Sequence, residues 1–297
     1  MGRAPRSARF AIGLLAAIGL WAPTGGQAYD TPLHQQFSFL AARYLNGCLA
    51  GTSTPRIEPL AVRYVARASE AEVEWGWTGW MFRSDFYDRA HQADKTWMWV
   101  LETRIHQRYR EYTQALEHET DDAKRYATLG RVVADLEDMT SPAHVVPVYF
   151  ARWWRLSFSD RFDNYPIDAD AVSASLAGAC EELLAEPLES FEELLVHTAS
   201  DTLRAVQRPI DGMPTSWQAF WKLAENPEDF GEYGTAGNNF GKRVEFGCQG
   251  QRCVLLDDDE LYKSFALDRH RRAVLSTARA MLWVQRTQVQ AVSVSRD

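Results

Sequence analysis

Two side chains that can bind a metal ion flank a break near the middle of the chain. Apolar residues recur at helical spacing from Leu129 to Met139, and the pattern stops at Pro142. Asp138 precedes this break by one turn, and His144 lies just past it. A carboxylate at a helix end and an imidazole on the following turn can converge on one point, which is a common way to build a metal site. The spacing also allows a solvated aspartate and a histidine that caps the next segment.

The sequence around this pair, LGRVVADLEDMTSPAHV over residues 129–145, resembles the core signature of the zinc-dependent phospholipase C and single-strand nuclease superfamily. In that superfamily the segment reads approximately LGRALHLLEDMxxPAHV. Its aspartate bridges two metal ions and the histidine after Pro-Ala binds one of them, so the resemblance implies these roles for Asp138 and His144. The superfamily also has a histidine four residues before the aspartate. Ala134 stands at that position here, and alanine cannot bind a metal.

Residues 1–28 have the features of a secretory signal peptide: three arginines, an apolar run and a small-residue cleavage site ending at Ala28. An uncleaved anchor is the alternative. Cleavage would predict a secreted or periplasmic protein that begins at Tyr29. Members of the superfamily begin with an aromatic residue whose amine and carbonyl bind a metal, together with a histidine a few residues on. The resemblance therefore implies that Tyr29 and His34 are metal ligands.

Residues 70–99 are rich in aromatic side chains. The superfamily has an acidic residue in this region and, about fourteen residues later, a metal-binding histidine in an HFYDP-like motif. The segment SDFYDR resembles that motif, which assigns Asp85 to the metal ligand and Glu72 to the acidic residue. A different register would make His91 the ligand. The aromatic residues at 75–82 are interpreted either as packed core or as an exposed lip that contacts a lipid surface or stacks on a base.

A further acidic ligand is implied by the segment SDRFDNY, residues 159–165. The superfamily has a histidine and, four residues later, an acidic residue about fifteen residues past its Pro-Ala-His. The resemblance places Asp163 on the acid and Ser159 on the histidine. Either Ser159 or the neighbouring Asp160 would have to replace this histidine as a ligand, and serine is a poor ligand for zinc.

Length and periodicity predict an all-α fold in a single domain, residues 29–297. Several long amphipathic patterns, including 95–116, 120–139 with Thr120 as its N-cap, and 261–284, indicate a multi-helix bundle with loop-rich insertions and a short hairpin after residue 220. Removing the signal peptide with its three arginines changes the net charge from −8 to −11. This acidic balance makes a nucleic-acid substrate less favoured.

The four cysteines suit an oxidising compartment. Cys248 and Cys253 lie close together in GCQGQRC, which favours their pairing and leaves Cys48 for Cys180. Three pairings are possible, and free buried thiols are a further alternative.

The resemblance implies a secreted phosphodiester hydrolase that cleaves phospholipid head groups with up to three zinc ions. Asp138 would bridge two ions, and Glu72 and Asp85 would hold a third or place the attacking water. Oxygen-rich ligands also suit magnesium, calcium or manganese. Two other functions remain open: a non-catalytic relative that binds lipid or a protein partner, and a single-strand nuclease.

Overall fold

The computed structural model describes residues 31–73, 86–89, 96–97, 101–102, 105–148, 160–185 and 187–294. Within these residues the helices are α1 (Thr31–Cys48), α2 (Pro59–Val73), α4 (Ile105–His118), α5 (Asp122–Asp138), α6 (Pro142–Val145), α7 (Ala169–Ser175), α8 (Cys180–Leu184), α9 (Phe191–Gln207) and α10 (Glu260–Val294). The 3-10 helices are η1 (Phe162–Asn164) and η2 (Trp217–Ala219). The sequence predicts an all-α fold, and the described residues show a mostly-α fold with little sheet.

The strands of the described residues form three separate two-stranded antiparallel sheets. They are β1 (Thr96–Trp97) with β2 (Leu101–Glu102), β3 (Trp221–Lys222) with β4 (Glu232–Tyr233), and β5 (Val244–Cys248) with β6 (Gln251–Leu255). The last pair is a hairpin whose turn residues, Gln249 and Gly250, both have positive φ, as a tight two-residue turn requires. The hairpin expected after residue 220 is thus confirmed.

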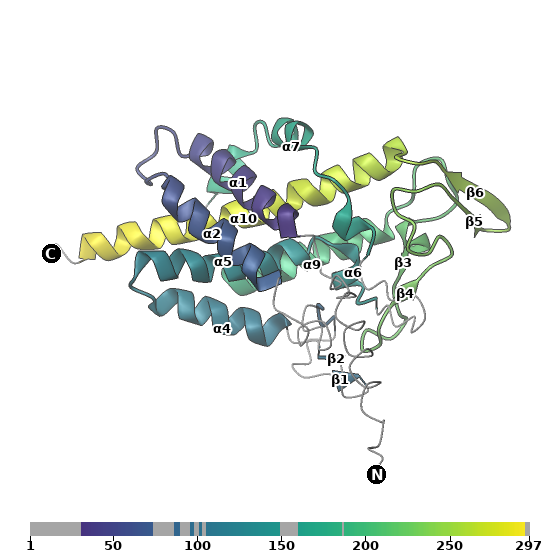
Figure 1. Cartoon of the computed structure of the whole chain (residues 1–297), viewed down its shortest axis with the longest axis horizontal. Coiled ribbons are helices and arrows are strands. Elements are labelled where there is room, and N and C mark those ends of the chain that lie inside the picture. Colours follow the sequence, from purple (N-terminus) through teal and green to yellow (C-terminus); the bar gives the residue numbers. More distant parts are fainter. Residues whose placement is uncertain are drawn as a thin grey trace, which may run out of the picture.

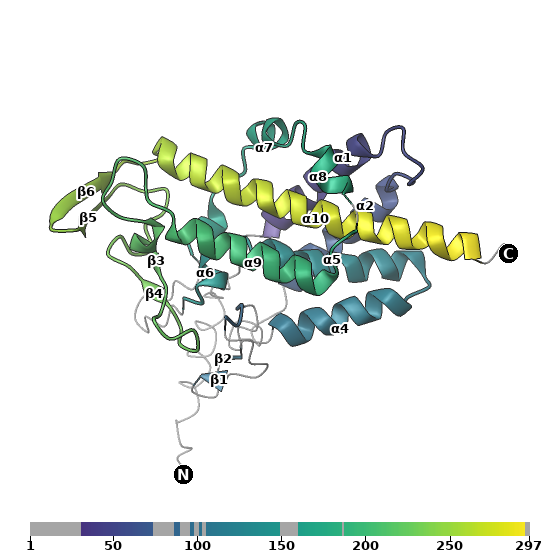
Figure 2. The same ribbon diagram turned by 180° about the vertical axis from the view of Figure 1, so that it is seen from behind.

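Helix α5 lies at the centre of the bundle, with α2, α4 and α10 packed against it (Figures 1 and 2). Helix α1 packs on α2 and α10, and α10 runs the length of the bundle beside α9. Helix α5 begins at an Asp121 N-cap, whose carboxylate accepts from the Lys124 backbone N–H at 2.9 Å. The N-cap predicted at Thr120 is therefore wrong by one residue. A carboxylate satisfies the open N–H groups of the first turn and suits the helix dipole.

The close approach of α2 to α5 depends on Gly130. A Cβ atom built at this glycine would lie 2.5 Å from the Val65 carbonyl oxygen and 2.6 Å from the Ala68 Cβ. Both are rigid parts of helix α2, so the two helices would have to separate. Glycine is otherwise unfavourable inside a helix by about 1 kcal/mol, and its presence here indicates that close packing outweighs propensity.

We expect Gly130→Ala to destabilise the protein by about 2 kcal/mol or more, because overpacking a tight contact costs more than the gain in helix propensity. Urea unfolding would measure the change. Gly47→Ala is the matched control, since Gly47 also lies in a helix and has no atom within 4 Å of the added Cβ. That control should be neutral or stabilising by up to about 1 kcal/mol. Equal stabilities of the two variants would contradict the packing account.

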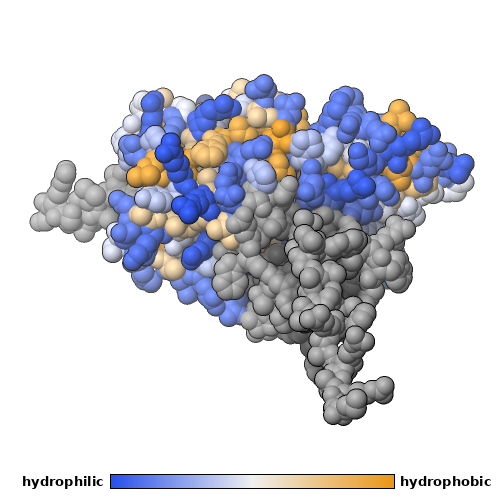
Figure 3. Space-filling model, viewed as in Figure 1, coloured by the Kyte–Doolittle hydropathy of each residue, from blue (hydrophilic) through white to orange (hydrophobic). Residues whose placement is uncertain are grey.

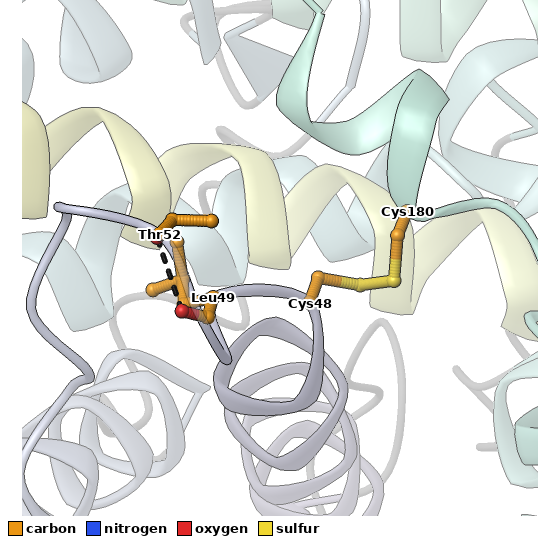
Figure 4. Close-up of a disulfide and its surroundings, with 4 residues drawn as sticks. All are labelled: Cys48, Leu49, Thr52 and Cys180. Carbon is orange, nitrogen blue, oxygen red and sulfur yellow. Dashed lines mark hydrogen bonds between the residues drawn. A yellow bond between two sulfur atoms is a disulfide. The ribbon is translucent and has the colours of Figure 1, made fainter.

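Both predicted disulfides are confirmed. Cys48 at the end of α1 bonds Cys180 at the start of α8, which fastens the first helix to a segment 132 residues further along (Figure 4). Cys248 and Cys253 bond across the β5–β6 hairpin. Two such bonds are typical of a protein that folds in a non-reducing compartment.

The coloured face of the molecule in Figure 3 is mainly hydrophilic, with apolar surface in separate patches. Large exposed apolar side chains in the described part of the chain are Phe39, Leu60, Val254 and Leu256. Among the described residues, none of the helices combines the length and the apolar character needed to cross a membrane.

Candidate metal centre

Asp138 and His144, the two candidate metal ligands of the central motif, flank the turn between α5 and α6. Asp138 is the last residue of α5, and Pro142 opens α6 at a position where a missing N–H costs nothing. The Ser141 backbone N–H donates to the Asp138 carbonyl at 2.9 Å, and the His144 N–H donates to the Ser141 carbonyl at 3.2 Å. Asp138 and His144 are 5% and 4% exposed. The interpretation of Asp138 as a solvated residue is therefore wrong, and Ser141, not His144, is the N-cap of α6.

His34 on α1 lies directly against Asp138. Its Nε2 is 3.4 Å from Asp138 Oδ1, and the histidine side chain is fully buried. Two ligands of one tetrahedral zinc ion, each at about 2.1 Å from the metal, would lie about 3.4 Å apart. The two atoms therefore stand at the separation of two ligands that share one tetrahedral metal ion.

His144 and Asp163 form a second pair. Asp163 lies in η1, and its Oδ2 is 3.9 Å from His144 Nε2, which is wider than the spacing of two ligands on a tetrahedral ion. The Ser141 hydroxyl donates to Asp163 Oδ1 at 2.5 Å. Each pair therefore includes one residue of the segment 138–144, and Ser141 of the same segment also contacts Asp163.

Part of the SDFYDR motif also reaches this turn. The Tyr87 backbone N–H donates to the His144 carbonyl at 3.0 Å, and the Phe86 ring lies 5.7 Å from the His144 imidazole, centroid to centroid. These are the two residues that follow Asp85.

Glu137 is a buried acid at this site that the sequence argument missed. His34 Nδ1 lies 2.6 Å from its Oε2, and the Thr277 hydroxyl of α10 donates to its Oε1 at 2.8 Å. Burial raises the pKa of the Glu137 carboxyl, and the contacts with His34 and Thr277 oppose that shift. One signal was available: Glu137 follows Val133 by four residues and therefore lies on the inward face of α5.

Two other acids near the motif have different partners. Asp135 pairs with Arg108 on α4, so it does not replace the missing histidine at Ala134. Asp160 Oδ2 accepts from Trp221 Nε1 at 2.9 Å and from the Tyr233 hydroxyl at 2.8 Å, while its Oδ1 accepts from the Phe162 N–H at 2.7 Å. These contacts give Asp160 a structural role, joining η1 to the β3–β4 sheet.

Several predicted site residues cannot be placed. Tyr29, Asp85, His91, Ser159 and the aromatic stretch at 75–82 lie outside the described residues. The backbone of Glu72 lies in the last turn of α2, but its side chain is not among those described. Within the described part of the chain, no three His, Cys, Asp or Glu side chains gather into a group that could hold a metal.

Comparison with protein-family models, with curated proteins and with solved structures found no match. The likeness to the phospholipase C and nuclease superfamily therefore depends on the motifs themselves.

A buried histidine near these pairs makes folding sensitive to pH. His270 on α10 is 1% exposed and lies between the rings of Phe37 on α1 and Phe162 in η1, at centroid distances of 5.5 and 5.8 Å. Burial lowers the pKa of His270 from 6.5 to about 3. The unfolded chain therefore takes up a proton below pH 6.5 that the folded protein does not accept until the pH approaches 3.

We expect the free energy of unfolding to fall as the pH drops from 6.5 towards 3, with a contribution from His270 of up to about 1.4 kcal/mol per pH unit. His270→Asn should reduce this slope in urea unfolding measured between pH 7 and pH 4. The matched control is His197→Asn, because His197 has a 62% exposed side chain. An unchanged slope in the His270 variant would show that its protonation is not coupled to folding.

Proposed function

We propose that this protein is a secreted, metal-dependent phosphodiester hydrolase similar to phospholipase C, acting on phospholipid head groups. One observation carries the proposal. His34 of α1 lies against Asp138, and Asp163 of η1 lies against His144, so two separate segments each place one side chain against the buried segment 138–144. These four are the described residues to which the superfamily motifs assign the role of metal ligand.

The types of donor in these pairs suit a divalent metal. Each pair offers one imidazole nitrogen and one carboxylate oxygen, a combination common in zinc sites, while the oxygens also suit harder ions. Two donors are fewer than the three or four protein ligands of a zinc site. We propose that the Tyr29 amine and the Asp85 carboxylate complete the set; the position of Phe86 beside His144 supports the second assignment.

The proposed reaction gives the side chains of the site separate roles. A bound divalent ion supplies an activated water nucleophile and stabilises negative charge on the phosphate. The resemblance assigns Asp138 a ligand role towards two ions, and the Ser141 hydroxyl holds the Asp163 carboxylate in place. We assign Glu72 and Asp85 to the placement of the attacking water. Burial of all four ligands limits the access of bulk water, which strengthens the attraction of their carboxylates for a bound cation.

The substrate class follows from charge and from the aromatic stretch. With a net charge of −8, or −11 after removal of residues 1–28, the protein is not suited to binding nucleic-acid phosphates through a basic surface. Residues 75–82 contain several tryptophans, which partition well into the interface of a bilayer. We therefore propose a lipid phosphodiester substrate and place single-strand nucleic acid second.

Hydrolysis of p-nitrophenyl phosphorylcholine would test the proposal, with protein that begins at Tyr29 and with zinc, manganese, calcium or magnesium added in turn. We expect release of nitrophenol that stops on chelation and resumes when metal is restored. A single-stranded oligonucleotide serves as the competing substrate. Absence of turnover with every metal, from folded protein with an authentic N-terminus, would contradict the hydrolase proposal.

One observation favours a second candidate, a non-catalytic relative that binds lipid. Ala134 is 2% exposed and occupies the position of a superfamily ligand, and the neighbouring Asp135 does not replace it because it pairs with Arg108. This candidate predicts that phosphatidylcholine vesicles capture the protein without hydrolysis, and that Trp77→Ala with Trp80→Ala abolishes flotation. Retained flotation of the double variant would remove the aromatic stretch from the account.

A further inference from the structure

We propose that Glu137 is a positioning residue, held by Thr277, that fixes the His34 ring with Nδ1–H towards α5 and Nε2 towards Asp138. The proposal deepens the function proposed above, on which its metal-binding consequence rests. The arrangement of the hydrogen bonds, however, is a property of the metal-free fold and can be measured by itself.

The geometry defines both edges of the imidazole ring. Nδ1 lies 2.6 Å from Glu137 Oε2, and Nε2 lies 3.4 Å from Asp138 Oδ1. The second Glu137 oxygen accepts from the Thr277 hydroxyl at 2.8 Å, so the carboxylate cannot rotate without losing a hydrogen bond. Three helices, α1, α5 and α10, therefore contribute to the orientation of one ring.

This contact selects one tautomer of the ring. A neutral imidazole has one N–H and one nitrogen with a lone pair. A carboxylate that accepts from Nδ1–H leaves Nε2 as the nitrogen with the lone pair, which is the form that binds a metal. A carboxylate behind a histidine ligand is a common way to orient the ring and raise its basicity.

Packing alone does not account for a glutamate at this position. Glu137 is 0% exposed, and the neighbouring inward residues of α5, Val133 and Leu136, are apolar. Burying a carboxylate is costly, and well-packed apolar residues often replace buried polar pairs without loss of stability. A buried acid with both oxygens engaged is therefore better explained by the orientation of His34 than by the stability of the bundle.

The first test measures the His34 tautomer in the metal-free protein. Long-range ¹H–¹⁵N correlation with ¹⁵N-labelled histidine distinguishes the two ring nitrogens, and loss of the signal in His34→Gln assigns it among the seven histidines. We expect Nδ1–H in the wild type and Nε2–H in Glu137→Met. Glu137→Gln should retain Nδ1–H, because its amide oxygen can still accept. An Nδ1–H tautomer that persists in Glu137→Met would overturn the proposal.

The second test measures the affinity for Zn²⁺ by calorimetry. We expect a loss of about 10- to 100-fold in Glu137→Met, the range found for outer partners of metal ligands, and a smaller loss in Glu137→Gln. If Glu137→Met does not fold, Thr277→Val replaces it in both tests, because this change removes the hydroxyl that holds Glu137 Oε1. A Thr277→Val variant with the wild-type His34 tautomer and the wild-type affinity for Zn²⁺ would count against the proposal. A tautomer shift in a protein that binds no Zn²⁺ would leave the positioning role intact and contradict the hydrolase function.

Discussion

Asp138→Asn is expected to lower phosphodiester hydrolysis by more than about 100-fold. Asparagine keeps the shape of the side chain but replaces a charged ligand with a neutral amide, which binds a divalent ion weakly. Loss of an outer partner of a metal ligand already costs about 10- to 100-fold, so loss of a ligand should cost more. Asp138 is also the residue assigned to both metal ions. Turnover of p-nitrophenyl phosphorylcholine at saturating metal would measure the effect.

Asp135→Asn is the matched control for this experiment. Asp135 lies on the same helix and is also buried, but it pairs with Arg108 on α4 rather than with His34. We expect the control to lose stability and to keep its activity per folded molecule within a few-fold. Equal turnover by Asp138→Asn and the wild type would remove Asp138 from the site, and equal losses in the two variants would indicate a general effect of disturbing α5.

Removal of the Cys48–Cys180 disulfide is expected to produce the largest loss of stability. The bond closes a segment of 132 residues, and the chain-entropy relation assigns such a loop about 5 kcal/mol. The loss of conformational restriction in the unfolded chain is the main cause. Guanidinium unfolding of the Cys48→Ala, Cys180→Ala double variant would measure the change.

The hairpin disulfide provides the comparison. Cys248 and Cys253 are separated by only 5 positions, for which the same relation gives about 2 kcal/mol. The corresponding double alanine variant should therefore be clearly more stable than the variant that lacks Cys48 and Cys180. A reversed order would mean that contacts around the hairpin, rather than loop closure, determine the contribution of each bond.

Local sequence patterns were sufficient for some features of this protein. The 3.6-residue periodicity predicts long helices, and the break at Pro142 identifies the turn that carries Asp138 and His144, because both features are encoded within a few residues. The short spacing of Cys248 and Cys253 likewise favours one disulfide and leaves the other pair by elimination. Capping at Asp121 instead of Thr120 is a shift of one residue, since both side chains can accept the same hydrogen bond.

Contacts between segments that are distant in sequence could not be predicted from local patterns. The contact of His34 with Asp138 followed from resemblance and not from spacing. The role of Glu137 depends on α1 and α10 meeting at one point, 103 residues before it and 140 residues after it in sequence. Asp160 was considered as a ligand, but the side chains that bind it come from strands β3 and β4, more than 60 residues away. The roles of neighbouring acidic residues in one motif therefore depend on the partners that the tertiary fold places beside each of them.

The metal content of the mature protein tests the central claim most directly. The protein should be processed to begin at Tyr29, because an additional residue would displace the proposed amine ligand, and it should be purified without chelators before elemental analysis. The account predicts about two or more equivalents of a divalent metal per chain, with loss of metal in Asp138→Asn but not in Asp135→Asn. A protein that contains no metal, and that no divalent ion stabilises against thermal unfolding, would contradict the account.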